Sequence, residues 1–551
     1  MAVSPFLSQK RIDEMIKAGH WENITLLDHF DRHVNKTPEK SAVVDYCHKT
    51  GLRRELTYQQ LAQNVNRIAI GLTKLGVEAG DVISCQLPNR WEFLALYLAS
   101  IKIGAAFNPM MPIFRHREVS YMIGFAEAKV VVVTTTFRGF NYLKMMQEVQ
   151  PELPCLKHIL AIGDVNAPSS FEKKLLIPTF EEEINIDTIL KPRRLAPNSV
   201  TQLLYTSGTT GDPKAVMHTS NSLLAGTKNF VERYALNATD NILMSSPLAH
   251  QTGFLVGVLI PIYLGTKVVY QDVWDADKAV LYIQDERIHF TMASTPFLAD
   301  MAASKAFENV DMRHFRTFVT GGAPIPRIVA GKARKKLHCE VYGVYGMTEN
   351  LALTACGPGD SEDKIYHTDG VVQKGNEVQI VNAEGMVLPR GEEGQVQTRG
   401  AYNCSGYLKR ADLTDQAIDA EGWLSTGDLA RMDDDGFIRI TGRSKDILIR
   451  GGENIPVVEV ENLIYKHQAI QDAALVGVPD ERLGERGCLF VTLIAGVNFT
   501  MDEMQRYLGE HHMAKQYWPE HLEVLNEIPR TLSGKIQKFK LRDTAKKFIT
   551  D

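Results

Sequence analysis

The fold is decided by a helix-then-strand pattern in residues 56–87, whose sequence is LTYQQLAQNVNRIAIGLTKLGVEAGDVISCQL. Thr57 suits the N-cap of a helix and Gly76 suits its C-terminal end. Between them, one helical face carries the apolar residues Leu61, Val65, Ile68, Leu72 and Leu75. The apolar run DVISCQL at 81–87 then predicts a short buried strand.

The same alternation continues beyond this stretch. RWEFLALYLASIKIG at 90–104 predicts a mostly buried helix, and KVVVVTT at 129–135 predicts a strand. Helices that alternate with strands favour parallel β-α-β layers. Near residue 375 the pattern changes to short strands with glycine turns, and LARMDDDGFIRITGR at 429–443 predicts a hairpin.

The last hundred residues predict a second, smaller unit. Helical patterns at 457–467 and 501–510 flank the strand-like runs DAALVGV and CLFVTLIA. We therefore expect an α/β fold with a large, multi-layered N-terminal domain at 1–443. It combines parallel-type sheets with a β-rich subdomain. A small, mobile α+β C-terminal domain at 446–551 follows a hinge at 444–446.

Composition narrows the class of protein. The 551 residues are 44% hydrophobic and 23% charged, and the net charge is −5. These values are typical of a soluble globular protein and give no electrostatic reason to expect nucleic acid as a partner. Seven cysteines without a C-x-x-C pair favour a reducing compartment. The apolar stretch 254–265 is too short to span a bilayer, so we expect a cytoplasmic protein without stable membrane insertion.

A second stretch, LLYTSGTTGDPKAVMHT at 203–219, indicates a binding loop for an anion. Backbone N–H groups beside glycines can approach phosphate oxygens closely, hydroxyl groups add donors, and Lys214 adds positive charge. The loop is not a Walker A motif, because Pro213 stands where that motif requires its second glycine. From these residues alone, a linker rich in Gly and Thr remains an alternative.

Four motifs together carry a family resemblance. YTSGTTGDPKAV at 205–216 resembles the phosphate-binding signature of the adenylate-forming superfamily, which includes acyl-CoA synthetases. The segments VYGMTEN at 344–350, STGDLARMDDDGFIRITGRSKDILIRGGENI at 425–455 and PRTLSGKIQK at 529–538 resemble its later motifs, in the family's order. The resemblance covers essentially the whole chain. Ala215 departs from the usual glycine, and Gln395 replaces a usual glutamate.

The resemblance implies ATP, Mg²⁺ and CoA as the ligands. The residues that it assigns to the β- and γ-phosphates are Thr206, Ser207, Gly208, Thr209, Thr210, Gly211 and Lys214. Glu349 would hold Mg²⁺, which keeps few protein ligands and several waters. Thr348 would hydrogen-bond the α-phosphate.

At the nucleoside end, the resemblance implies that Tyr345, with Gly346, stacks on adenine, and that Gly322 and Ala323 line the same side. Asp428 would accept from the ribose hydroxyls, and Arg443 would reach the same sugar. Each assignment has a plainer alternative. Tyr345 can be an ordinary core aromatic residue, and Asp428 and Arg443 can form a salt bridge that binds no ligand.

The remaining residues that the resemblance implies act in the family's two half-reactions, which are formation of an acyl-adenylate and transfer of the acyl group to CoA. Lys535 would bridge the substrate carboxylate and the α-phosphate, although a lone lysine is usually a solvated surface charge. Lys445 would be the hinge, and Gly451 and Gly452 would leave room for the pantetheine arm of CoA. His250 would lie beside the acyl and pantetheine tunnels, with a structural histidine as the alternative.

The function implied is that of an ATP-dependent, AMP-forming acid–CoA ligase acting on a small-molecule carboxylic acid. Within the family, the chain is most similar to short- and medium-chain fatty acyl or cyclohexanecarboxylate–CoA ligases. Three alternatives remain: an adenylation enzyme that loads a carrier protein, a luciferase-like oxygenase, and a catalytically silent sensor of AMP or acyl-adenylate. The sequence leaves open which acid is used and what the oligomeric state is, a homo-oligomer included.

Overall fold

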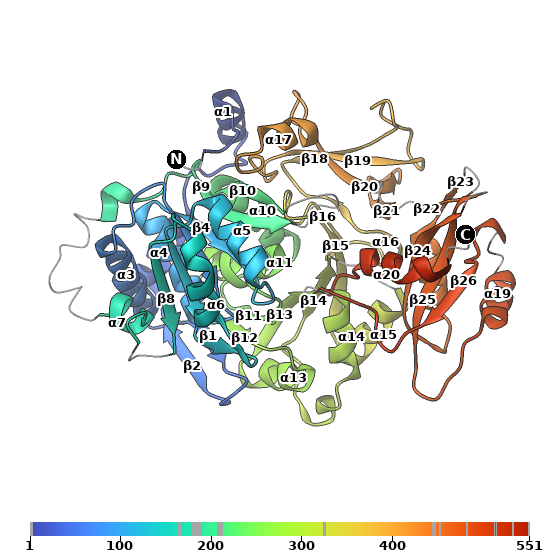
Figure 1. The fold of residues 1–551 in the computed structure, drawn as a ribbon, viewed down its shortest axis with the longest axis horizontal. Coiled ribbons are helices and arrows are strands. Elements are labelled where there is room, and N and C mark those ends of the chain that lie inside the picture. The colour runs from blue at the N-terminus through green and yellow to red at the C-terminus, as the bar shows by residue number, and fades with distance from the viewer. Residues whose placement is uncertain are drawn as a thin grey trace.

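The computed structural model describes residues 4–548 apart from 164–166, 178–189, 207–212, 323–326, 444–447, 451–452, 481–482, 512, 514 and 532–533. We call residues 4–443 the N-terminal part and 448–548 the C-terminal part. The sheets of the N-terminal part fill most of the view, and the C-terminal part forms a separate sheet at its right edge (Figure 1). The α/β fold class is confirmed. The expected hinge at 444–446 lies outside the described residues.

The stretch at 56–87 forms the predicted elements. Helix α3 (Tyr58–Lys74) begins after Thr57, whose side chain accepts a hydrogen bond from the Gln60 backbone. The chain leaves the helix through Gly76 at a φ of 81°, a backbone conformation that glycine adopts at little cost. Strand β3 (Val82–Gln86) follows and is buried throughout. Helix α4 (Trp91–Ile103) is buried along nearly its whole length, as its sequence predicts.

Two large sheets form the N-terminal part. The six-stranded sheet has the order β10 (Lys214–Thr219), β9 (Val200–Thr206), β4 (Ala106–Pro109), β3, β5 (Val130–Thr134) and β8 (His158–Ile162). The nine-stranded sheet has the order β17 (Val371–Val372), β16 (Thr354–Ala355), β15 (Glu340–Tyr345), β14 (Thr317–Gly321), β13 (Ile288–Ala293), β11 (Asn241–Met244), β12 (Val268–Gln271), β1 (Ser41–Tyr46) and β2 (Arg53–Thr57). Most neighbouring strands are parallel, as expected for β-α-β layers.

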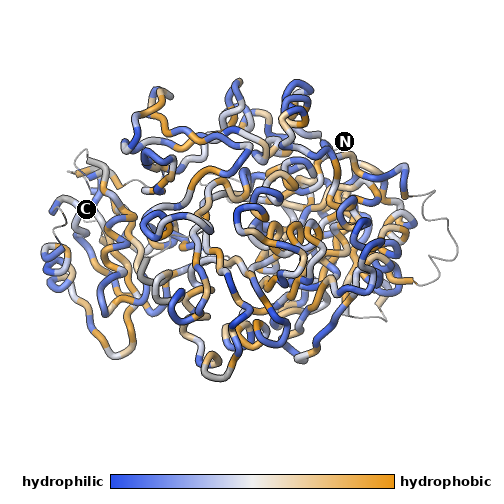
Figure 2. Tube along the Cα trace, turned by 180° about the vertical axis from the view of Figure 1, so that it is seen from behind, coloured by the Kyte–Doolittle hydropathy of each residue, from blue (hydrophilic) through white to orange (hydrophobic). Residues whose placement is uncertain are grey.

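Helices separate and cover these sheets. One hydrophobic cluster joins Ile83 and Phe107 of the smaller sheet, Leu94 of α4, and Ile242 and Phe290 of the larger sheet. Figure 2 shows hydrophobic segments of the chain running through the interior of the molecule. Further helices of the described N-terminal part include α1 (Gln9–Lys17), α2 (Leu26–Lys36), α5 (His116–Ala126), α6 (Tyr142–Val149), α7 (Phe171–Leu175), α10 (Ser220–Arg233), α13 (Ala276–Asp285), α14 (Thr295–Ala303), α15 (Arg327–Leu337), α16 (Glu362–His367) and α17 (Ala411–Ala417).

The apolar stretch at 254–265 is a buried, segmented helix, as expected. It consists of the end of α11 (Gln251–Phe254), a π-helical turn at Leu255–Leu259 and α12 (Ile260–Leu264). No described helix is long and apolar enough to span a bilayer. All seven cysteines are free thiols.

The β-rich region is a four-stranded antiparallel sheet of β18 (Asn376–Val381), β19 (Glu393–Gly400), β20 (Leu424–Met432) and β21 (Ile438–Arg443). The predicted hairpin is its β20–β21 pair. A short pair of strands, β6 (Thr136–Phe137) and β7 (Phe140–Asn141), stands apart.

The C-terminal part has its own sheet and hydrophobic clusters. Its strands are β22 (Leu448–Arg450), β23 (Glu453–Ile455), β24 (Ile470–Asp480), β25 (Gly484–Leu493) and β26 (His521–Val524). Helices α18 (Val457–Ile464), α19 (Met501–Glu510) and α20 (Lys538–Ala545) pack with it. Strands β24 and β25 are the two runs that the sequence predicts.

Candidate active site

The glycine- and hydroxyl-rich loop connects two antiparallel strands. Thr206 ends β9 and Lys214 begins β10, and the two residues are register partners. Ser207, Gly208, Thr209, Thr210 and Gly211 lie outside the described residues. The Lys214 ammonium lies 4.8 Å from the centre of the Tyr407 ring, a cation–π contact. The structure therefore holds the two ends of the loop in place beside an aromatic residue that the motif does not contain.

Glu349 has a buried carboxyl group, and one of its two oxygens accepts a hydrogen bond. The Tyr407 hydroxyl donates to its Oε1 at 3.0 Å, and the residue is only 4% exposed, while Oε2 makes no hydrogen bond within the described chain. Burial raises the pKa of the carboxyl group, and the positive charges of Lys214 and Arg443 oppose that rise. An unpartnered buried carboxylate oxygen is suited to a cation.

Thr348 is fixed through its backbone. The Nε2 atom of His218 lies 2.7 Å from the Thr348 carbonyl oxygen, and its Nδ1 lies 3.1 Å from the Ser222 hydroxyl. Because a carbonyl only accepts hydrogen bonds, Nε2 carries the proton. Complete burial lowers the pKa of His218 to about 4, so the ring is neutral near pH 7. Sequence reasoning missed both His218 and Tyr407, since no motif assigns them a role.

Three residues assigned to the nucleoside meet at one point. The Tyr345 hydroxyl donates to Oδ2 of Asp428 at 2.7 Å, and the Arg443 Nε lies 2.9 Å from Oδ1. Asp428 and Arg443 are register partners across the β20–β21 hairpin. Burial and the Asp428 charge raise the pKa of the Tyr345 hydroxyl. The salt bridge that the sequence offered as an alternative exists, and whether the pair also binds a sugar stays a prediction.

Two glycines assigned to the adenine side differ in their surroundings. A Cβ on Gly346 would lie 1.7 Å from the carbonyl oxygen of Leu351, so no larger residue fits there. Gly322 has a φ of 76° and open space where a Cβ would stand. Ala323, the next residue, lies outside the described chain. Gly346 therefore lets two backbone segments pack closely.

A small cavity lies beside Thr348. Its apolar wall is formed by Pro109, Met111, Phe114, Leu204 and Ala249. Its polar wall is formed by Tyr205, His250, Gln251 and Thr348. His250 is the N-cap of α11, and its Nδ1 accepts from the Thr252 backbone at 3.3 Å. The cavity thus brings the predicted His250 and Thr348 together.

Lys535 reaches this region from the C-terminal part. Burial and the positive charge of Lys535 together lower the pKa of His250 to about 4. The Thr531 backbone N–H donates to the Lys535 carbonyl at 2.8 Å, and the Lys535 backbone N–H donates to the Thr531 hydroxyl at 3.0 Å. Gly534, with a φ of 82°, touches the N-terminal part, since a Cβ there would lie 2.5 Å from the Ser294 hydroxyl. Lys445, Gly451 and Gly452 lie outside the described residues.

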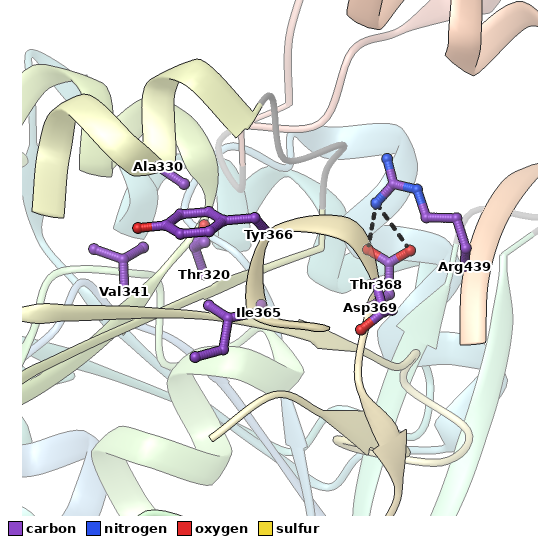
Figure 3. Close-up of a pocket in the computed structure, with 9 residues that line it drawn as sticks. Thr320, Ala330, Val341, Ile365, Tyr366, Thr368, Asp369 and Arg439 are labelled. Atoms are coloured by element: carbon purple, nitrogen blue, oxygen red, sulfur yellow. Dashed lines mark hydrogen bonds and ion pairs between the residues drawn. The ribbon is translucent and has the colours of Figure 1, made fainter. Parts of the chain in front are cut away.

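A second cavity lies beside strands β14 and β15 and is lined by Thr320, Val341 and Gly343 (Figure 3). The ring of Tyr366 covers it between Thr320 and Val341, and Asp369 pairs with Arg439 at 3.2 Å at one edge. The Thr320 hydroxyl is buried and makes no hydrogen bond within the described chain. None of the predicted site residues lines this cavity.

Metal binding by several side chains has no support in the described part of the chain, where no three His, Cys, Asp or Glu residues are grouped to hold an ion. The site nevertheless fits Mg²⁺ held by one carboxylate together with phosphate oxygens and water. The unpartnered Oε2 of Glu349 is the atom that fits this arrangement.

Comparison with known proteins places these residues in context. The AMP-binding enzyme family matches residues 30–408, and the AMP-binding enzyme C-terminal domain matches 459–535. A medium-chain fatty-acid–CoA ligase of Escherichia coli K12 is 34% identical over 551 residues, covering 100% of this chain and 95% of that protein. A vibriobactin-specific 2,3-dihydroxybenzoate-AMP ligase of Vibrio cholerae is 29% identical, covering 95% and 94%. The crystal structure of the anthranilate CoA ligase AuaEII with anthranoyl-AMP has a TM-score of 0.83 at 23% identity, covering 96% and 98%.

Proposed function

Because the chain belongs to the family of AMP-binding enzymes and is an AMP-forming ligase, we propose that it joins a carboxylic acid to CoA through an acyl-adenylate. The observation that carries this proposal is a cavity lined by both His250 and Thr348, together with the charge of Lys535, from the C-terminal part, which acts on His250. A cation delivered to a cavity beside a phosphate-type loop suits the reaction of two anions.

The proposed reaction has two steps. In the first, a carboxylate oxygen attacks the α-phosphorus of ATP, and the bond from that phosphorus to the bridging oxygen breaks to release pyrophosphate. In the second, the CoA thiolate attacks the acyl carbon, and AMP leaves with the oxygen that linked acyl group and phosphorus. The first step needs charge neutralisation and alignment more than covalent help from the protein.

We assign the phosphates to Thr206, to the loop at 207–211 and to Lys214. Tyr407 positions two of the groups involved, because its ring contacts Lys214 and its hydroxyl donates to Glu349. When bound at Glu349, Mg²⁺ would neutralise phosphate charge. His218 holds the backbone of Thr348, whose side chain we assign to the α-phosphate.

We assign the ribose to Asp428 and Arg443 and the adenine ring to Tyr345. Among the described residues, Tyr345 contacts one oxygen of Asp428 and Arg443 contacts the other, and a carboxylate oxygen has two lone pairs. One acceptor site on each oxygen therefore stays available for a sugar hydroxyl.

Between the steps, we propose that the C-terminal domain turns about a hinge at 444–446, which contains Lys445. Two observations support this division. Strand β21 ends at Arg443 in one sheet and β22 begins at Leu448 in another. The C-terminal sheet also has hydrophobic clusters of its own. After the turn, Gly451 and Gly452 would border the pantetheine arm of CoA.

We propose a short- or medium-chain or alicyclic acid as the substrate and CoA as the acceptor. The medium-chain fatty-acid–CoA ligase of E. coli supports both choices, because it aligns with the whole of this chain. A carrier-protein acceptor is the second candidate, which the similarity to an acid–AMP ligase favours.

The test is pyrophosphate release with ATP, Mg²⁺ and a panel of acids, followed by addition of CoA or of a phosphopantetheinylated carrier protein. We expect acid-dependent pyrophosphate release and a thioester with free CoA. Thioester on the carrier alone would identify a carrier-loading enzyme. No acid-dependent release with any acid would favour a silent sensor and overturn the proposal.

A further inference from the structure

Gln251 is a polar side chain in a cavity whose wall is otherwise largely apolar. It follows His250, lines the cavity and is only 5% exposed. Neither its Nε2 nor its Oε1 makes a hydrogen bond within the described residues. A carboxamide offers two donors and an acceptor, so this side chain is equipped to bind a group that the protein does not supply.

Two other polar groups of the wall differ from Gln251 in this respect. The Tyr205 hydroxyl donates to the carbonyl of Met122 at 3.0 Å, and Nδ1 of His250 accepts from Thr252. A buried, unpartnered polar group has a free-energy cost, because it loses its hydrogen bonds to water and gains none in the protein. An acyl chain made only of carbon and hydrogen would leave this cost in place, whereas a ligand with a hydrogen-bonding group would remove it.

The backbone that carries Gln251 is held firmly. Asn89 accepts from the Leu248 backbone and donates to the Ser246 carbonyl, both at 2.9 Å. Gly253 packs so tightly that a Cβ would lie 2.0 Å from the Pro247 carbonyl oxygen. Loop 245–250 and the start of α11 therefore keep the Gln251 carboxamide at the cavity.

A second unpartnered carboxamide, that of Gln202, lies on β9 two residues before Leu204 of the cavity wall and is not itself among the lining residues. Gln202 is fully buried, and both of its amide atoms lack a hydrogen bond within the described chain. On β9 it shares a face with Leu204, which lines the cavity. Its register partner is His218, whose ring bonds the carbonyl of Thr348, another residue of the cavity wall.

We propose that Gln251 is a specificity-determining residue that hydrogen-bonds a neutral polar substituent of the acid, with Gln202 as a further partner. The substrate class is a short-chain or cyclic carboxylic acid that carries a hydroxyl or oxo group beyond the carboxylate. The substituent is neutral because the surrounding wall of Pro109, Met111 and Phe114 would leave a second charge unsolvated. This inference rests on the proposed function and refines its substrate.

The test uses matched pairs of acids in the pyrophosphate assay. The pairs are hexanoate with its 3-, 4- and 5-hydroxy derivatives, benzoate with the three hydroxybenzoates, and cyclohexanecarboxylate with its hydroxy derivatives. We expect at least one hydroxy acid to exceed its parent in kcat/KM by about 10–100-fold. In Gln251→Met, which keeps the length of the side chain, this ratio should fall towards one, mainly through a higher KM for the hydroxy acid. Gln202→Met should lower the ratio less.

Gln373→Met is the matched control, since Gln373 is buried but bonded to Val371 and does not line the cavity. Its ratio should equal that of the wild type. Gln251→Asn keeps the carboxamide and should shift the favoured position of the hydroxyl group. If parent and hydroxy acids react equally well, or if Gln251→Met keeps the preference, the inference is wrong while the proposed function stands. If no acid releases pyrophosphate, both are wrong.

Discussion

The surroundings of Glu349 and the loop of Lys535 assemble their charged groups in opposite ways. Glu349 is enclosed by the N-terminal part, where Tyr407 donates to its side chain and the Cys404 backbone N–H donates to its carbonyl. The Lys535 loop is organised inside the C-terminal part by an ion pair of Arg530 with Asp472 at 2.5 Å. Within the described residues, Gly534 of this loop lies close to Ser294 and Pro296 of the N-terminal part. The negative charge of Glu349 is therefore built into the N-terminal part, whereas the positive charge of Lys535 depends on docking of the C-terminal part.

Removing the delivered charge should have the largest effect. We expect Lys535→Ala to slow acyl-adenylate formation by about 100–1,000-fold, because an electrostatic contact in the transition state is lost. Thioester formation from a supplied acyl-adenylate should be spared. Rapid-quench measurement of each half-reaction checks this, and equal losses in both would contradict the assigned role.

Disturbing the docking while keeping the charge should have the next largest effect. In Gly534→Ala, the methyl group would stand 2.5 Å from the Ser294 hydroxyl and 3.1 Å from Pro296 Cγ, so the Ser294 side chain or the loop must move. We expect adenylation to fall by about 10–100-fold, since small misplacements are costly, and thioester formation to change little. The same rapid-quench measurement of the two half-reactions checks this expectation.

Gly496→Ala is the control for backbone strain, because Gly496 has the same φ of 82° and a methyl group there would have no atom within 4 Å. It should leave both half-reactions unchanged. Equal losses of adenylation in the two variants would attribute the effect to strain rather than to docking.

Removing the hydrogen bond that Tyr407 donates to Glu349 should have a smaller effect. Tyr407→Phe keeps the ring beside Lys214 but removes the hydrogen bond to Oε1 of Glu349. We expect kcat/KM for pyrophosphate release at saturating Mg²⁺ to fall by about 5–10-fold. Tyr234→Phe is the control, since the Tyr234 hydroxyl is buried and makes no hydrogen bond within the described residues. A Tyr407→Phe enzyme with wild-type activity would argue against the positioning role.

The smallest expected effect concerns His218 and the dependence of the free energy of unfolding on pH. Because the pKa of His218 is about 4 in the folded protein and about 6.5 when exposed, the unfolded chain binds more protons between these values. The stability contributed by neutral His218 is complete above pH 6.5 and is lost as pH falls towards 4, by up to about 3 kcal/mol. Denaturant titrations across this range should give a shallower pH dependence for His218→Gln than for the wild type, and identical slopes would contradict the prediction.

Local signals in the sequence predict the elements well. Thr57 and Gly76 bound α3 as expected, and the Asp-Gly turn joins β20 to β21. These features depend on neighbouring residues, which a single sequence displays. The site residues within motifs, such as Glu349 and Asp428, follow from the family resemblance.

The supporting residues could not be predicted in this way. Tyr407 lies far along the chain from Lys214 and Glu349, and His218 meets Thr348 only because β10 and the segment after β15 come together in the fold. Gln251 follows a motif histidine, but its lack of a partner within the described residues is a property of the packed cavity. Contacts between distant segments depend on tertiary packing, which periodicity and capping do not encode.

The close approach of Gly253 to Pro247 bears on attempts to engineer the enzyme for new acids. Any side chain at 253 would displace the loop that carries His250, so mutant libraries that include this codon would lose activity for reasons unrelated to selectivity. Libraries that leave Asn89 and Gly253 intact and diversify Met111, Phe114 and Leu204 would reshape the acyl binding space on an undisturbed scaffold.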